Sequence, residues 1–194
     1  MWILTLIGFA VMALTHVAQA PFLLDKMAGD RAVWHMSRDA PATVYLTLDD
    51  GPNPATTRDL LDVLARERVQ ATFFVIDDHL TDQTVPIVRR MFAERHAVGL
   101  RSASRRTMLL DGTELAGTRP CRAFRPHAGW RNGEMYVGLQ RSGYRLIGWG
   151  WMLWDWNWFR RRTADSIVKR LAARVSAGDI VVMHDSDESA PFRD

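Results

Sequence analysis

The sequence contains a single cysteine, Cys121, which excludes an intrachain disulfide and any zinc site built from several cysteines. It also lacks a strong excess of one charge, since the net charge is only +3 at pH 7. The basic residues form no continuous stripe and gather instead at Arg105–Arg106 and Arg160–Arg162, the second cluster beside several tryptophans. Aromatic residues next to arginine can stack on nucleotide bases, but they suit a sugar-binding groove or a core equally well. The modest charge therefore argues against a nucleic-acid-binding protein.

No apolar run reaches the roughly 20 residues that a transmembrane helix needs. The longest, Trp2–Leu14, is followed by Ala18-Gln19-Ala20, a small-x-small pattern typical of a signal-peptide cleavage site. No lysine or arginine precedes the run, and a buried N-terminal helix is the structural alternative. We predict that residues 1–20 are a signal peptide or an N-terminal membrane anchor. The protein would then be exported and be periplasmic, membrane-anchored or extracellular.

The rest of the chain alternates short apolar strands with amphipathic helices. Its length suits one domain, which we place at residues 44–194 after a lead-in segment at 21–43. Periodicity predicts strands at 44–48, 71–76, 97–100, 123–126, 144–150 and 178–185, and helices at 56–68, 84–94, 114–116, 133–141 and 163–175. This order indicates an α/β fold with a mostly parallel sheet wrapped by helices, either open or closed into a barrel.

The most informative segment is Val44–Asn53, a strand that ends in Asp49, Asp50 and a Gly-Pro turn. In α/β sheets, ligands and catalytic groups gather at the carboxyl ends of strands. Adjacent carboxylates repel each other and therefore need a cation or a basic partner. One can bind a metal while the other acts as a general base, which suits metal-assisted hydrolysis. The alternative is an ordinary strand followed by an Asp-Gly turn.

Other polar residues fall at the predicted strand ends, as in the active site at the top of a barrel. They are Arg101, Arg125, Asp155, His184 and Asp185. Each has a structural alternative, such as a surface salt bridge for Arg125 or a plain strand exit for His184-Asp185. Five tryptophans in the segment 149–158 are too many to bury together, and they suit a sugar-binding groove.

Five segments, taken together, resemble one enzyme family. They are Thr47–Pro52, Ala71–Val75, Phe124–Asn132, the tryptophan-rich stretch around Asp155, and Val182–Asp185. In their order and placement over residues 44–185, they resemble the motifs of the NodB-homology polysaccharide deacetylases, the fourth carbohydrate esterase family.

The resemblance implies a deformed (β/α) barrel that hydrolyses N- or O-acetyl groups on sugar polymers with a divalent metal, most often zinc. By position, Asp49 would be the general base and Asp50 a metal ligand. Arg125 would orient and tune Asp49, and a backbone N–H near Ala128 would help to hold the oxyanion.

The remaining roles come from the later motifs. His184 would be the general acid that protonates the leaving amine, and Asp155 its tuning partner. The substrate-binding residues would be Ala128, Trp130, Trp154, Trp156 and Trp158.

One departure from the family pattern bears directly on the metal. Arg101 and Arg105 stand where the family has the two metal-binding histidines of a His-x-x-x-His motif. A guanidinium is always charged and has no lone pair to give to a metal. Two such cations beside Asp50 would repel a metal and form ion pairs with the carboxylates. An unorthodox site of Asp50, His127 and water is the alternative.

The domain is also shorter than the resemblance leads one to expect. Residues 106–124 leave too little room for a full helix between the second and third motifs, and the chain ends soon after Asp185. We therefore expect an incomplete barrel.

Two functions remain. The first is a hydrolase that removes acetyl groups from an envelope or extracellular amino-sugar polymer. The second is a catalytically impaired homologue that binds glycans or is a degenerate remnant. Either protein would have an acetylated polysaccharide or oligosaccharide as its partner, with membrane attachment through residues 1–20.

Overall fold

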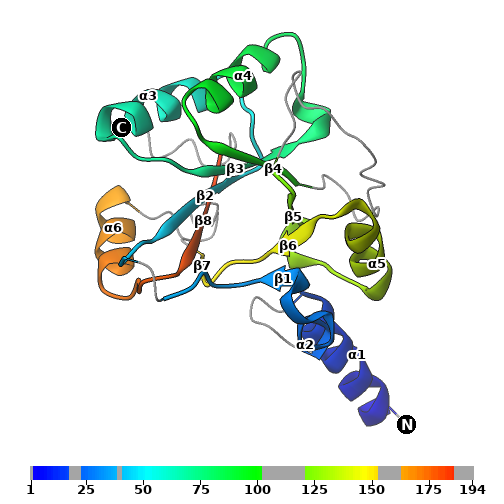
Figure 1. Ribbon diagram of the computed structural model, residues 1–194. Helices are drawn as coiled ribbons and strands as arrows, with labels where there is room; N and C mark the ends of the chain where they lie inside the picture. The colour runs from blue at the N-terminus through cyan, green and yellow to red at the C-terminus, as the bar shows by residue number, and fades with distance from the viewer. Residues whose placement is uncertain (1, 18–22, 39–40, 102–120, 153–162, 186–194) are drawn as a thin grey trace.

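The computed structural model describes residues 2–17, 23–38, 41–101, 121–152 and 163–185 (Figure 1). The described strands form one sheet in the order β1-β6-β5-β4-β3-β2-β8-β7, and all neighbouring strands are parallel. They are β1 (Ala32–Val33), β2 (Tyr45–Asp49), β3 (Thr72–Ile76), β4 (Ala97–Arg101), β5 (Ala123–Arg125), β6 (Arg145–Ile147), β7 (Trp151–Met152) and β8 (Ile180–His184). The sheet curls into an open half-barrel with helices around its outside (Figure 1). The predicted α/β class and incomplete barrel are confirmed.

Strand β3 lies in the middle of the sheet and is apolar on both faces. Phe73, Phe74, Val75 and Ile76 are all buried, as expected for a parallel strand covered on both sides. Gly99 of β4 lies opposite Phe74, and a Cβ there would come within 2.9 Å of the Phe74 ring and of the Ala123 carbonyl. A glycine at this position therefore allows β3, β4 and β5 to approach closely.

The helices follow the predicted periodicity. They are α3 (Thr57–Glu67), α4 (Val85–Ala93), α5 (Gly133–Ser142) and α6 (Ala164–Ala172), each close to its predicted range. Helix α3 buries Leu61 and Leu64, and α4 buries Ile87, Val88 and Met91. The predicted helical piece at 114–116 lies outside the described residues.

The predicted strand at 144–150 is wrong in extent. Strand β6 ends at Ile147, and the chain continues to β7 on the opposite edge of the sheet, next to β8. A Cβ on Gly148 would lie 2.3 Å from the Trp34 ring, and one on Gly150 would lie 2.6 Å from the His35 ring. These two glycines let the chain after Ile147 pass directly against the lead-in segment.

The lead-in segment has structure that the sequence pattern did not predict. It contains α2 (Leu23–Ala28), the 3-10 turn η1 (Gly29–Arg31) and β1. Just after β1, the Met36 N–H donates to the Gly178 carbonyl at 2.9 Å, and His35 forms an antiparallel bridge with Asp179. The lead-in thus supplies one edge strand and joins it to the segment before β8.

A buried ion pair fixes this lead-in to the body of the domain. Arg131 donates through Nε to Asp25 Oδ1 at 2.9 Å and through Nη2 to Asp25 Oδ2 at 2.7 Å. The Tyr136 hydroxyl also donates to the Asp25 carboxylate, and all three side chains are buried. Removing one member of such a pair leaves a buried charge without its partner.

Helix α1 (Trp2–Val17) projects from the domain (Figure 1). Its described side chains, residues 2–11, are exposed, including Trp2, Leu4 and Phe9. For residues 2–11, this contradicts the alternative of a buried N-terminal helix. Among the described residues, no helix has both the length and the apolar character needed to cross a bilayer.

We predict that Asp25→Ala will lower the free energy of unfolding by about 3–5 kcal/mol, because it leaves the buried Arg131 unpaired. The matched control is Asp30→Ala in the same segment, where the side chain is exposed and the change should stay within about 0.5 kcal/mol. Denaturant unfolding measures both. An Asp25→Ala cost below about 1 kcal/mol would show that the ion pair does not anchor the lead-in.

Candidate functional site

The site begins with Asp49, the last residue of β2. Residues 47 and 49 of a strand point to the same face, and here that face carries the buried Thr47 and Asp49 side chains. Strand β2 lies between β3 and β8, so Asp49 is in the interior of the sheet and not at an edge. This buried carboxylate is one of the polar groups that were predicted to cluster at the strand ends.

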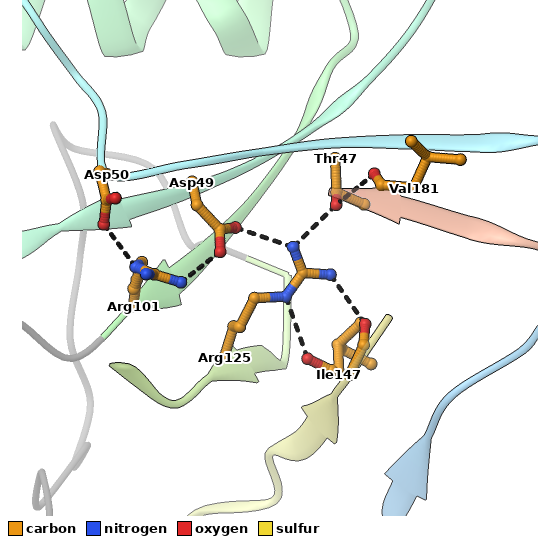
Figure 2. Close-up of polar contacts among 8 residues, drawn as sticks. Thr47, Asp49, Asp50, Arg101, Arg125, Ile147 and Val181 are labelled. Atoms are coloured by element: carbon orange, nitrogen blue, oxygen red, sulfur yellow. Dashed lines mark hydrogen bonds and ion pairs between the residues drawn. The ribbon is translucent and has the colours of Figure 1, made fainter. Parts of the chain in front are cut away.

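Arg125, the last residue of β5, is fully buried and reaches across the sheet to Asp49 (Figure 2). Its Nη1 donates to Asp49 Oδ1 at 2.8 Å and to Thr47 Oγ1 at 2.7 Å. Its Nε and Nη2 donate to the carbonyls of Ile147 and Gly148, and its guanidinium lies over the Phe74 ring. The alternative of a surface salt bridge for Arg125 is therefore wrong.

Arg101, at the end of β4, bridges the two adjacent carboxylates (Figure 2). Its Nη1 pairs with Asp49 Oδ2, and its Nε lies 2.6 Å from Asp50 Oδ1. The second contact is an ion pair only, because its geometry does not meet that of a hydrogen bond. The predicted pairing of this arginine with the carboxylates is present, and the Arg101 side chain is buried between them.

The electrostatic balance at Asp49 favours the carboxylate form. Burial by itself raises the pKa of the Asp49 carboxyl. The charges of Arg101 and Arg125 act in the opposite direction, with a further contribution from His184. They outweigh burial and hold the pKa of Asp49 below its ordinary value of 3.8, so Asp49 is ionised at neutral pH.

Asp50 begins the loop after β2 and has a left-handed backbone, with φ of 71°. Its side chain is about one quarter exposed, unlike that of Asp49. The backbone carbonyl of Asp50 lies 2.9 Å from Nδ1 of His79, in the 3-10 turn η2 (Asp77–His79) before α4. The Asp50 carboxylate is thus partly exposed to solvent, and its buried partner is Arg101.

His184 ends β8, and its Cα is paired with that of Asp49 in the register of the two strands. The next residue, Asp185, is buried and accepts hydrogen bonds from the hydroxyls of Thr56 and Thr57. A Cβ on Gly51 would lie 2.8 Å from Asp185 Oδ2. The carboxylate of Asp185 therefore joins the end of β8 to the start of α3 and the loop after Asp50.

A cavity of about 800 Å³ opens beside Asp50. Its lining includes apolar groups of Pro52, Pro54 and Ile76. The polar residues around it include Asp50, Asp78, His79, His127 and Asp185. A cavity that combines apolar walls with a few polar groups is the ordinary form of a small-ligand site.

The loop between β5 and α5 borders this cavity. It forms the turn η3 (His127–Gly129), in which Ala128 has an unusual positive φ of 50°. Arg131 donates to the Gly129 carbonyl at 2.9 Å, and Asn132 caps α5 by accepting from the Met135 N–H. His127 lines the cavity, so this loop reaches the rim of the site, while Ala128 is exposed and Trp130 half-buried.

The described residues do not fit the divalent metal that the family resemblance implies. Among these residues, no three histidine, cysteine, aspartate or glutamate side chains are grouped to hold an ion. Both carboxylates at the expected position are paired with Arg101. His96, the one histidine near that motif in sequence, lies at the opposite end of β4, where its Nδ1 accepts from the Ala71 N–H.

Several predicted site residues lie outside the described part of the chain. They are Arg105, Trp154, Asp155, Trp156 and Trp158. The alternative metal site of Asp50, His127 and water stays a prediction, although both residues line the same cavity.

Three residues important to the site were missed from the sequence. Thr47 could have been found from strand alternation, because a polar residue two positions before Asp49 shares its face. Thr56 and Thr57 gave no such signal, since threonines at the start of a helix are common. Their bonds to Asp185 depend on a contact between distant parts of the chain.

Comparison with known proteins relates the chain to one family. The family model described as polysaccharide deacetylase matches residues 37–147. A chitooligosaccharide deacetylase of Sinorhizobium fredii is 33% identical over 186 residues, which cover 84% of this chain and 84% of that protein. A peptidoglycan-N-acetylglucosamine deacetylase of Bacillus cereus is 26% identical over 155 residues, covering 73% of this chain and 72% of the relative.

A solved structure supports the fold. The crystal structure of the Bc1960 peptidoglycan N-acetylglucosamine deacetylase superposes with a TM-score of 0.72 at 21% identity. The match covers 86% of this chain and 81% of the other. The half-barrel is therefore an architecture that this solved deacetylase also has.

The lowered pKa of Asp49 predicts a specific acid sensitivity. A carboxyl whose pKa is lower in the folded state stabilises the fold above its unfolded pKa, and this contribution is lost as the pH falls through the folded value. We expect Asp49→Asn to cost about 3–5 kcal/mol at neutral pH, because Arg125 loses a buried partner. The difference from wild type should shrink as the pH falls below 3.8.

Denaturant unfolding between pH 7 and pH 2 measures this difference. The control is Asp62→Asn, which removes an exposed partner of Arg90 and should cost less than about 1 kcal/mol. A wild-type minus Asp49→Asn difference that stays constant down to pH 2 would contradict the electrostatic account of Asp49.

Proposed function

We propose, on the basis that this chain belongs to the polysaccharide deacetylase family, that its site hydrolyses acetyl groups on an amino-sugar polymer of the cell envelope or the extracellular space. The relatives named above are deacetylases of chitooligosaccharides and of peptidoglycan. They support a polysaccharide as the substrate class and do not favour a catalytically impaired homologue. The choice of an amino-sugar polymer of the envelope or extracellular space is our proposal.

The observation that carries this proposal is the register of β2 and β8. It pairs Asp49 with His184 on neighbouring strands, so an anionic carboxylate and an imidazole reach the same edge of the sheet. Hydrolysis of an amide needs a base for the attacking water and an acid for the leaving amine. The two groups have the right chemistry for these two tasks.

In the proposed reaction, the Asp49 carboxylate accepts a proton from a water molecule as its oxygen attacks the acetyl carbon. Protonated His184 donates a proton to the sugar nitrogen as the carbon–nitrogen bond breaks. Acetate and a free amine leave, and the proton passes from Asp49 to His184 to restore both groups. In this reaction Arg125 has no direct role in the proton transfers, and it fixes the orientation of Asp49 and keeps it ionised.

The cavity beside Asp50 is our candidate for part of the sugar-binding surface. Its apolar wall and polar rim suit a sugar ring, which has both apolar faces and hydroxyl groups. Trp130, in the loop at the rim, could stack on such a ring. We propose an N-acetyl group over an O-acetyl group because His184 would be needed to protonate an amine.

The family is generally metal-dependent, and zinc is the metal expected from the resemblance. Since the described residues do not fit a metal, the reaction above includes no metal-dependent step. The bridge made by Arg101 is also the observation that favours the second candidate function, a protein that binds acetylated glycans without hydrolysing them. Acetate release separates the two functions.

For location, we propose export, with residues 1–20 acting as a signal peptide or as an attachment to a membrane surface. Helix α1 presents exposed apolar side chains at Trp2, Leu4 and Phe9. Such a surface suits insertion into the boundary between lipid headgroups and acyl chains.

The first test is acetate release from N-acetylated chitooligosaccharides and from peptidoglycan fragments. We expect Asp49→Asn to reduce kcat by about 10²–10⁴-fold, which is the usual size of a general-base contribution. Asp62→Asn, on the outer surface of α3, should leave kcat unchanged. The proposed function fails if the wild-type protein binds these glycans but releases no acetate, and equal turnover in Asp49→Asn would remove Asp49 as the base.

The second test concerns helix α1. The full chain should sediment with vesicles of phosphatidylglycerol and phosphatidylethanolamine. The double variant Leu4→Asp and Phe9→Asp should stay in solution, because charge on the apolar surface of α1 opposes insertion. Val168→Asp changes an equally exposed apolar residue on α6 and should still sediment. Equal sedimentation of the full chain and both variants would argue against attachment through α1.

A further inference from the structure

We propose that Arg101 is a permanent, protein-borne cation that takes the place of a divalent metal between Asp49 and Asp50, so that this site excludes zinc. The inference deepens the proposed function, on which it rests, by concerning the cofactor requirement of the same site. It starts from a disagreement between the family pattern and this chain's own residues.

The position of Arg101 is the first argument. The side chain extends from the end of β4 and is buried, and its guanidinium contacts both neighbouring carboxylates at once (Figure 2). A metal held between Asp49 Oδ2 and Asp50 Oδ1 would have to lie where this guanidinium now lies. Arg101 and such a metal would therefore compete for the same carboxylate oxygens.

Charge is the second argument. Two carboxylates, Asp49 and Asp50, face two guanidinium groups, Arg101 and Arg125. This cluster is already electrically balanced without a metal. A divalent ion added beside a buried guanidinium would be repelled, and repulsion between like charges is strong where water is excluded.

The chemistry of the replaced ligand is the third argument. A histidine nitrogen can give a lone pair to zinc, whereas a guanidinium cannot and keeps its charge at any pH that the fold tolerates. Moving Arg101 aside to admit a metal would break its contacts with both carboxylates. The exclusion of metal is thus a property of the side chain itself and needs no other residue to enforce it.

Zinc titration by calorimetry tests the proposal independently of activity. Wild-type protein should bind no zinc that is removed by Asp50→Asn. The double variant Arg101→His and Arg105→His restores the family's two histidines and should bind zinc with micromolar affinity. Adding Asp50→Asn to this double variant should abolish that binding, because Asp50 would be a ligand.

The matched control is the single variant Arg105→His, which adds a histidine but keeps the Arg101 bridge and should bind no zinc. Zinc should also raise the Tm of the double variant but not of the wild type, since ligand binding to the folded state stabilises it. Circular dichroism establishes that each variant is folded before it is titrated.

Two results would overturn the proposal. One is zinc binding by the wild type that Asp50→Asn removes, and the other is a folded double variant that binds no zinc. If the double variant does not fold, the titrations of wild type and Arg105→His decide by themselves. Failure of the proposed function would appear separately, as no acetate release with or without a chelator, and would leave the zinc result intact.

Discussion

The Asp49 carboxylate is buried at the end of β2, and a buried charge is costly unless it is paired, so the fold must surround it with positive charge and N–H donors. Arg125 reaches it from β5 and Arg101 from β4. Arg125 is itself buried and needs the carbonyls of Ile147 and Gly148, which ties it to the end of β6. A single buried charge thereby connects neighbouring and distant strands at one edge of the sheet, and that edge carries the candidate site.

The same physical device appears a second time where the lead-in meets the domain. Asp25 is buried against Arg131 and Tyr136, and Arg131 also holds the Gly129 carbonyl. Gly129 follows Ala128, whose positive φ is uncommon for a residue with a side chain. The ion pair therefore does more than attach an N-terminal segment. It also fixes the loop at the rim of the cavity, so the lead-in belongs structurally to the site.

Much of this arrangement could be predicted from the sequence, because the strands and helices have clear apolar periodicity. Asp49, Arg125 and His184 were correctly placed at strand ends, since parallel strands bring their carboxyl ends to one edge. The lead-in was missed because β1 is only two residues long and gains its order from contacts with distant segments. Thr57 was missed for the same reason, since its role depends on a carboxylate far away in the sequence, Asp185.

Family resemblance gives equal weight to every motif, but the contacts at this site separate two kinds of residue. Asp49, Arg125 and Asp185 hold strands and a helix together through buried polar contacts, so the fold needs them whether or not a metal binds. Position 101 differs, because a histidine there would serve a metal, while arginine satisfies the carboxylates without one. The retained motifs therefore support the family and the fold, and the metal requirement has to be judged from Arg101 alone. In the described residues, the charges of Asp49 and Asp50 are balanced by Arg101 and Arg125, which come from the chain itself.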